Sequence, residues 1–206
     1  MSGLGGVGTL SYAAARATNG RKAVGWHRYR LLAVPRAGMP AMPRGYEVSA
    51  ASDAELAALA DVGPEARAWR TGQGMTPLIA RRGGAVVGIT WLTDRAFDED
   101  EVRARWVPPA GCAWDTGLWV EPSQRLSRAF AALWAGTAAW LADRDLDWSV
   151  SRIADYNLGS LGPHRRMGAI ELGTAAFATL GNLQIATRGR PKLTGGRTTV
   201  PLKLPA

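Results

Sequence analysis

The chain has 206 residues, of which 47% are hydrophobic and 20% are charged, and it carries a formal net charge of +8. A chain of this length and composition buries enough surface to fold as one domain, which excludes an intrinsically disordered protein. The positive charge favours an anionic partner, but its sign alone does not choose among a nucleotide cofactor, nucleic acid and an anionic lipid surface.

The cysteine and histidine counts narrow the class further. Cys112 is the single cysteine and the chain has two histidines, so we expect neither an intramolecular disulfide nor a zinc site. No stretch approaches the roughly 20 apolar residues of a membrane-spanning helix, and no secretion signal is recognisable. A cytoplasmic protein without a membrane span is the expectation.

The first part of the sequence predicts short helices and strands. In order, they are a helix over 10–17, a strand over 26–34, a strand over 46–51, a helix over 54–59 and a helix over 64–69. Ser52 or Asp53 suits the N-cap of the fourth element, because a short side-chain oxygen accepts bonds from the free amides of the first turn. Three prolines in 35–44 predict a connecting loop.

The middle of the sequence predicts a hairpin and a strand. Residues 77–81 and 85–93 flank Gly83 and Gly84, which supply the positive φ of a tight turn. The acidic residues 98–101 and two prolines then predict a loop that leads to a strand over 112–120.

The last part predicts a long amphipathic helix over 124–143, because apolar residues recur there at helical spacing. The elements expected after it are a strand over 148–153, a helix over 160–167 and strands over 174–180 and 183–187. This order predicts a mixed α/β fold in which the late strand-helix units favour parallel pairing.

Two short segments have distinctive patterns. The first is the run Leu118-Trp119-Val120-Glu121-Pro122, followed by Arg125 and a predicted helix, and the second consists of Asn157, Ser160, His164, Met167 and Gly168. The first is similar to the strand that leads into the acyl-CoA pyrophosphate loop of the GNAT superfamily of acyl-CoA-dependent N-acyltransferases, and the second resembles that family's second signature in its spacing. The resemblance implies a single domain with a mostly antiparallel sheet and a splayed parallel pair flanked by helices.

The resemblance also implies where acetyl-CoA or a longer acyl-CoA binds. The residues that it assigns to the cofactor are Leu118, Trp119, Val120, Arg125, Leu126, Ser127, Arg128, Ala129, Phe130, Asn157 and Ser160. A helix N-terminus offers free amides and a partial positive charge, which suits a pyrophosphate. The strand around Leu118 would leave backbone groups for the pantetheine arm and the thioester carbonyl.

Arg128 and Phe130 depart from the family pattern, which has small residues at both positions. Glycine there lets the backbone approach the phosphates, so Phe130 narrows or shifts the expected site. One alternative hypothesis is therefore a catalytically inactive GNAT-like binding module.

Acyl transfer needs an acid for the leaving thiolate and a base for the acceptor amine. By position, His164 replaces the family's usual Tyr acid, and Tyr156 is a substitute acid. Asp115, a lone carboxylate on a predicted buried strand, is the expected base. A surface histidine and a structural hydrogen bond of Asp115 are the alternative interpretations.

The function expected from these residues is transfer of an acetyl or longer acyl group to an amine of a small molecule, peptide or protein. A third hypothesis is a basic protein that binds RNA or an anionic surface through Arg28, Arg30, Arg165, Arg166, Arg188 and Arg190, although no nucleic-acid signature surrounds them. The expected segments are an N-terminal extension over 1–45, the GNAT-like domain over 46–187 and a basic arm over 188–206. Formation of a homodimer is left as a possibility by the sequence.

Overall fold

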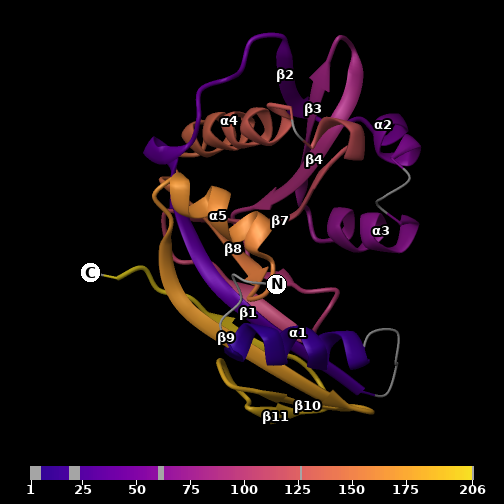
Figure 1. Cartoon of the computed structure of the whole chain (residues 1–206), viewed down its shortest axis with the longest axis vertical. Coiled ribbons are helices and arrows are strands. Elements are labelled where there is room, and N and C mark those ends of the chain that lie inside the picture. The colour runs from indigo at the N-terminus through magenta and orange to yellow at the C-terminus, as the bar shows by residue number, and fades with distance from the viewer. Residues whose placement is uncertain (1–5, 19–23, 60–62, 126, 206) are drawn as a thin grey trace. The chain divides into compact units, whose positions relative to one another are not determined.

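The structure is a computed structural model that describes residues 6–18, 24–59, 63–125 and 127–205 (Figure 1). The chain forms two compact units, each assembled from separate stretches of sequence. The first unit comprises Met1–Ala33, Ala96–Pro109 and Ser151–Ala206, and the second unit comprises Val34–Arg95 and Ala110–Val150.

The second unit contains a mixed sheet with helices on both faces. Its elements are η1 (Arg36–Gly38), β2 (Tyr46–Ala50), α2 (Asp53–Ala58), α3 (Pro64–Gly72), β3 (Thr76–Arg82), β4 (Ala85–Thr93), β7 (Cys112–Val120), η2 (Pro122–Gln124), α4 (Ala129–Ala142) and the start of β8 (Trp148–Ala154). Strands β2, β3, β4 and β7 pair antiparallel in that order, whereas β7 pairs parallel with β8 over Cys112–Trp114. Figure 1 shows α4 on one face of this sheet and α2 and α3 on the other.

Local sequence signals explain several elements of this unit. Ser52 caps α2 in a reciprocal capping box with Glu55, as expected from the residue type. The hairpin between β3 and β4 turns at Gly83 and Gly84, whose φ angles are 57° and 81°. Both predictions are confirmed.

Helix α4 differs from the amphipathic helix predicted over 124–143. Residues 122–124 form a 3₁₀ turn and α4 begins only at Ala129, so the predicted start was wrong. Leu133, Trp134 and Gly136 of α4 are buried, and the helix packs on β2, β3 and β4. A polar face was expected from the charged residues that flank the helix, and they lie outside it.

The first unit combines a second group of strands with helices α1 and α5. Its elements are α1 (Gly6–Thr18), β1 (Val24–Pro35), β5 (Phe97–Asp98), β6 (Ala104–Val107), the end of β8, α5 (Leu158–Arg166), β9 (Ile170–Leu180), β10 (Leu183–Ala186), β11 (Leu193–Thr194) and β12 (Thr198–Pro201). Strand β9 pairs antiparallel with β1 and with β10, and β12 pairs parallel with β6. Figure 1 shows α1 lying across β1, where Trp26 Nε1 donates to Ser11 Oγ over 3.2 Å.

The predicted loop before β7 is present at residues 99–103 and 108–111, but the short strands β5 and β6, which form an antiparallel pair, interrupt it. Glu99 is buried rather than solvated. The prediction of a mixed α/β fold is confirmed. The segments 1–45, 46–187 and 188–206 stay a prediction about folding units.

Among the helices in the described ranges, none combines the length and the hydrophobicity of a bilayer-crossing segment.

Candidate active site

Strand β7 carries the residues predicted to contact the pantetheine arm, and it contains a β-bulge. Ile89 lies opposite Trp119 while Trp91 lies opposite Thr116, so β7 has one extra residue between these pairs. Gly117 in this bulge has φ of 61°, and a Cβ on it would lie 2.2 Å from Arg70 Nη1. A bulge interrupts the ladder locally and re-aims the strand. An isolated glycine in a strand pattern is the sequence signal that predicts it.

The three predicted residues at the end of β7 face two directions. Leu118 and Val120 pack against the buried cluster that includes Leu133 of α4. Trp119 lines a pocket of about 580 Å³ on the opposite side, together with Glu55 and other residues of α2 and β4. The strand end is therefore anchored to α4 by its apolar side chains.

The connection from β7 to α4 places two guanidinium groups in solvent. Arg125 and Arg128 are exposed, and no carboxylate in the described part of the chain forms an ion pair with either. Ser127 Oγ accepts a bond from the amide of Ala129 over 3.2 Å, and Arg128 between them is the N-cap of α4. The N-terminus of α4 thus combines two cations with the positive end of a helix dipole. Leu126 lies outside the described residues.

Phe130 is half-buried at the start of α4, and its ring centroid lies 6.2 Å from that of Trp134. The Phe130 side chain is therefore held along its own helix. Ala129 beside it is buried.

Asn157 and Ser160 have structural bonds at the start of α5. Asn157 is the N-cap, and its Oδ1 accepts from the amide of Ser160 over 3.2 Å. An Asn at this position satisfies an amide that the helix leaves free. The sequence spacing thus already corresponds to a helix cap.

His164 is buried on α5, and its Nδ1 lies 2.7 Å from the carbonyl oxygen of Ser160. A carbonyl only accepts, so Nδ1 carries the proton. Burial lowers the pKa of His164 below 6.5, more than the bond to Ser160 raises it, so the ring is neutral at pH 7. A neutral ring protonated at Nδ1 has no proton on Nε2 to donate. The role of acid stays a prediction, and this geometry does not favour it.

Asp115 is buried on β7 and accepts a hydrogen bond from Ser149 Oγ over 2.6 Å. Ser149 belongs to β8, so the bond joins the two parallel strands. This agrees with the structural interpretation of Asp115, and its role as a base stays a prediction.

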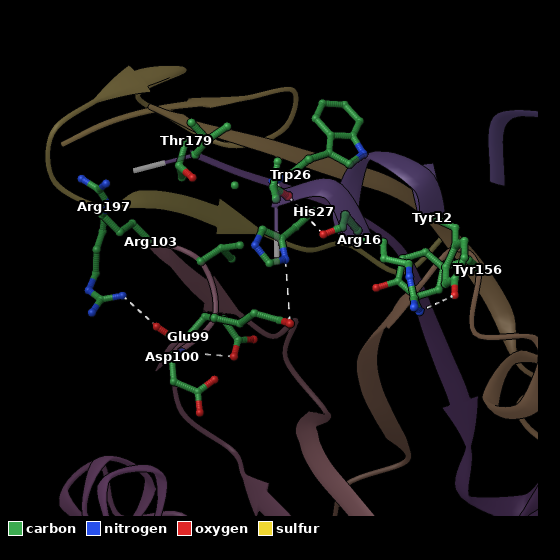
Figure 2. Close-up of a pocket in the computed structure, with 16 residues that line it drawn as sticks. Tyr12, Arg16, Trp26, His27, Glu99, Asp100, Arg103, Tyr156, Thr179 and Arg197 are labelled. Atoms are coloured by element: carbon green, nitrogen blue, oxygen red, sulfur yellow. Dashed lines mark hydrogen bonds and ion pairs between the residues drawn. The ribbon is translucent and has the colours of Figure 1, made fainter. Parts of the chain in front are cut away.

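The first unit contains a pocket of about 700 Å³, shown in Figure 2 and called the first-unit pocket below. It is lined by Tyr12, Ala15, Arg16, Thr18, Val24, Gly25, Trp26, His27, Glu99, Asp100, Glu101, Val102, Arg103, Tyr156, Thr179 and Arg197. Figure 2 shows Tyr12 and Tyr156 at one end and Arg103 and Arg197 at the other. Of the described residues predicted for the site, Tyr156 lines this pocket.

Tyr156 meets Tyr12 edge to face, with ring centroids 5.4 Å apart. Burial raises the pKa of the Tyr156 hydroxyl above 10, so it keeps its proton at neutral pH. The group can therefore donate a proton but cannot accept one readily.

His27 and Glu101 form a pair in the same pocket that the sequence did not predict. His27 Nδ1 lies 3.8 Å from Glu101 Oε1, and Glu101 Oε2 accepts from the hydroxyl of Tyr29 over 2.7 Å. Arg152 Nη1 also lies 2.9 Å from this carboxylate. Alternation along β1 places His27 and Tyr29 on one face, but no local signal indicates the partner at Glu101.

Glu99 and Arg152 form a buried ion pair next to the His27 and Glu101 pair. Glu99 is 1% exposed, and it accepts from Arg152 Nε and, over 3.2 Å, from Trp106 Nε1. Burial raises the pKa of Glu99, but the charge and hydrogen bonds of Arg152 outweigh burial and hold it well below 4.5. Arg152 thus links both acidic side chains to β8.

The predicted residues divide between the units. Asp115, 118–120, 125 and 127–130 belong to the second unit, and Tyr156, Asn157, Ser160 and His164 belong to the first. Within the first unit, Asn157, Ser160 and His164 are joined by hydrogen bonds.

Two of the arginines proposed for RNA or an anionic surface are already paired within the first unit. Arg28 Nη1 lies 2.5 Å from Asp155 Oδ2, and Arg30 Nη1 lies 3.0 Å from Glu171 Oε2. Pairing lowers the net charge that they offer to an external anion.

No family model matches the sequence, and no curated protein is similar enough to count as a match. Solved structures are similar in fold. A structure of a Drosophila protein has a TM-score of 0.52 at 14% identity, covering 86% of this chain and 58% of its own. A putative GNAT acetyltransferase from Novosphingobium aromaticivorans has a TM-score of 0.50 at 15% identity, covering 85% of this chain and 78% of its own.

A tandem GNAT protein from the clavulanic acid biosynthesis pathway has a TM-score of 0.50 at 15% identity, covering 74% of this chain and 53% of its own. This chain thus spans little more than half the length of the Drosophila and tandem proteins. At these identities the likeness concerns the arrangement of strands and helices. The chain has the GNAT fold.

Proposed function

We propose that the protein is an acyl-CoA-dependent N-acyltransferase. The observation that carries the proposal lies in the second unit, where the bulge at Gly117 in β7 is followed along the chain by the N-terminus of α4. A bulged strand that leads into a helix start with exposed Arg125 and Arg128 suits a ligand with an extended arm and a pyrophosphate.

The residues at the start of α4 suit acyl-CoA in their chemistry as well as in their position along the chain. Arg125 and Arg128 can pair with phosphate oxygens, and guanidinium groups form such bonds in a planar, two-pronged geometry. Ser127 and Ala129 contribute the helix start, and Phe130 packs on Trp134. The bound donor supplies an activated thioester, and the protein orients it.

For the acid, we favour Tyr156 over His164. The Tyr156 hydroxyl keeps its proton and lines a pocket, whereas His164 has its proton on Nδ1 and shares it with a backbone carbonyl. Asp115 remains the expected base from the sequence. The acceptor is an amine.

Calorimetry with acetyl-CoA and a longer acyl-CoA tests the cofactor directly. We expect micromolar binding, and a double variant Arg125→Ala/Arg128→Ala should weaken it about tenfold or more, because two charge-assisted bonds are lost. Arg44→Ala is the matched control, since Arg44 is exposed in the same unit and far along the chain from the helix start. Equal affinities of the double variant and the wild type would exclude this phosphate site.

Binding without turnover would point instead to the inactive module. Release of CoA on addition of amines separates the two, and a protein that binds acyl-CoA but releases no CoA with any amine contradicts the enzymatic proposal.

A further inference from the structure

One face of the strands β1, β9, β10 and β11 in the first unit carries aliphatic side chains. Residues that oppose each other across antiparallel strands point to the same face of a sheet. Val24 of β1 opposes Leu180 of β9, and Leu180 opposes Leu183 of β10. Ile185 lies two positions after Leu183 and opposes Leu193 of β11. These five residues therefore share one face, called the aliphatic face below, on strands that Figure 1 shows side by side.

The aliphatic face is exposed, whereas the opposite face of the same strands is buried. Its members on β9, β10 and β11 are between 52% and 70% exposed, namely Leu180, Leu183, Ile185 and Leu193. Between the two exposed residues of β10, Gln184 is buried and its side-chain amide is hydrogen-bonded at both ends. Strand β10 thus reverses the usual pattern, in which a sheet buries its apolar side chains and exposes its polar ones. Contiguous apolar surface of this kind marks an interaction site.

Helix α1 covers the neighbouring part of this side of the sheet. Trp26 follows Val24 by two positions, so it points to the same side, and its Nε1 donates to Ser11 of α1 over 3.2 Å. On the same helix, Leu10 is 72% exposed and Val7 is 60% exposed. Helix α1 therefore adds aliphatic surface next to the aliphatic face.

The segments that build this side of the first unit contain cations and no carboxylates. Neither 1–46 nor 172–206 contains an Asp or a Glu, and these stretches supply α1, β1, β10, β11 and nearly all of β9. The basic residues of the second stretch are Arg188, Arg190, Lys192, Arg197 and Lys203. The acidic residues of the first unit lie in other segments, so the surroundings of the aliphatic face have a positive potential.

Two cations lie at the rim of the aliphatic face. The guanidinium of Arg103 donates to the carbonyl oxygen of Gly181 over 2.8 Å and to that of Asn182, and these two residues form the turn between β9 and β10. Lys192 is exposed and directly precedes Leu193. In the described part of the chain, neither cation forms an ion pair with a carboxylate. Both charges are therefore left for an external anion.

An anionic lipid bilayer suits this combination better than a second copy of the chain or a peptide does. Two copies in contact through the aliphatic face bring like charges together, and the segments that build the face hold no carboxylate to pair with them. Strand β11 has two residues, which is short for pairing with an added peptide strand. A bilayer takes apolar side chains at its headgroup boundary, and its anionic headgroups attract nearby Lys and Arg.

We propose that the aliphatic face docks the first unit on the surface of an anionic lipid bilayer. The four exposed side chains on β9, β10 and β11 enter the headgroup boundary, and Arg103 and Lys192 lie next to anionic headgroups. This contact involves no acyl donor, so its tests do not depend on the proposed acyl transfer.

Sedimentation with sucrose-loaded vesicles tests lipid binding. The wild type should bind vesicles with about 30% phosphatidylserine about tenfold or more tightly than vesicles of phosphatidylcholine alone. Leu183→Ser/Ile185→Ser should weaken binding to the anionic vesicles about tenfold or more, because apolar burial is lost. Met42→Ser is the control, since Met42 is 43% exposed in the second unit. No binding of the wild type to anionic vesicles at low salt, or equal binding of the folded double variant, overturns the proposal.

Lys192→Gln tests the electrostatic part without changing the aliphatic face. Binding to anionic vesicles should weaken about fivefold, while binding to neutral vesicles should not change, because each Lys or Arg near an anionic surface contributes about that factor. High salt should reduce the difference between the wild type and this variant. An equal loss on both kinds of vesicle contradicts a contact with anionic headgroups.

A fluorescent label shows which side of the first unit meets the lipid. Cys112 is buried, and burial raises the pKa of its thiol to about 11, so an introduced exposed cysteine reacts first at neutral pH. On Ile185→Cys, the emission of an NBD label should shift to the blue with anionic vesicles and be quenched by nitroxide-labelled lipid. Thr199→Cys is the control, because Thr199 is exposed on β12 while Thr198 beside it faces Gln184. Equal responses at both positions contradict docking through the aliphatic face.

Sedimentation equilibrium without lipid tests for a second copy at the same face. The wild type and Leu183→Ser/Ile185→Ser should have the same mass, and thermal denaturation should show that the double variant is folded. A wild-type dimer that the folded double variant dissociates assigns the aliphatic face to a contact between copies and overturns the lipid proposal. If the double variant does not fold, Lys192→Gln and the label on Ile185→Cys decide.

Discussion

At the scale of single residues, the ion pair of Glu99 and Arg152 ties the strand β5 region to β8 in the first unit. Both side chains are largely removed from water, so each relies on the other for solvation. The folded-state pKa of Glu99 lies below 4.5, so its contribution to stability is present above pH 4.5 and is lost as the pH falls toward the folded value.

Arg152→Met should lower the free energy of unfolding by about 3–5 kcal/mol at pH 7, because it leaves a buried carboxylate without its cation. Urea denaturation measures this loss. The remaining burial should raise the pKa of Glu99, so the variant should regain stability between pH 7 and pH 5. Adding Glu99→Gln should recover part of the loss at pH 7. A single-variant loss below about 1 kcal/mol contradicts the importance of the pair.

At the scale of elements, the close packing of α4 on β2 is set by one glycine. A Cβ on Gly136 would lie 2.2 Å from Val48 Cγ1. In Gly136→Ala, overpacking should cost about 1–3 kcal/mol of stability, whereas the better helix propensity of Ala should return about 1 kcal/mol. We therefore expect a net loss of stability. Gly72→Ala in α3 is the control, because nothing lies within 4 Å of its Cβ position, and it should be neutral or stabilising. Thermal denaturation of both variants measures the change in melting temperature relative to the wild type. A higher melting temperature of Gly136→Ala would contradict the close contact between α4 and β2.

Helix α5 allows the cap of Asn157 to be separated from its predicted contact with the acyl donor. Asn157→Ala should lower the free energy of unfolding by about 1 kcal/mol, whereas Asn157→Asp keeps an oxygen acceptor and should lose less. If the side chain only caps the helix, Asn157→Asp should retain the acyl-CoA affinity. An equal loss of affinity in both variants would show that the amide itself contacts the ligand. Urea denaturation and calorimetry give the two quantities.

Element boundaries also show how far local patterns reach. The cap at Ser52, the hairpin at Gly83 and the strand 112–120 were predicted from short sequence signals, and the structure has each of them. The start of α4 was predicted too early because residues 124–128 continue the helical spacing while Pro122 begins a 3₁₀ turn. The pair β5 and β6 was missed because the strands have only two and four residues, which is too short for a clear alternating pattern.

At the scale of the whole molecule, the net charge of +8 makes the affinity for a multiply charged anion depend on salt. Raising NaCl from about 0.05 to 0.5 M should weaken acyl-CoA binding several-fold, because the Debye length falls from about 14 to about 4 Å. Calorimetry at both salt concentrations measures the change. The Arg125→Ala/Arg128→Ala variant should have a shallower dependence. An affinity independent of salt contradicts an electrostatic phosphate site.

The sequence by itself determined the class of fold and the places where chemistry was to be sought. Hydrophobic periodicity, caps and glycines act within a few residues, so the strand from 112 to 120 and the capped helix after Asn157 could be predicted from local rules. The isolated Gly117 could also have indicated the bulge.

Only the tertiary structure decided which of those residues meet and in what protonation state. Glu99 and Arg152 are 53 positions apart, and Tyr29 and Glu101 are 72 apart, so no local pattern joins them. The carbonyl of Ser160 fixed the proton of His164 on Nδ1, and the walls of the first-unit pocket placed His27 beside Glu101. The physical reason is that burial and long-range pairing, which set pKa values, arise only when distant segments pack together.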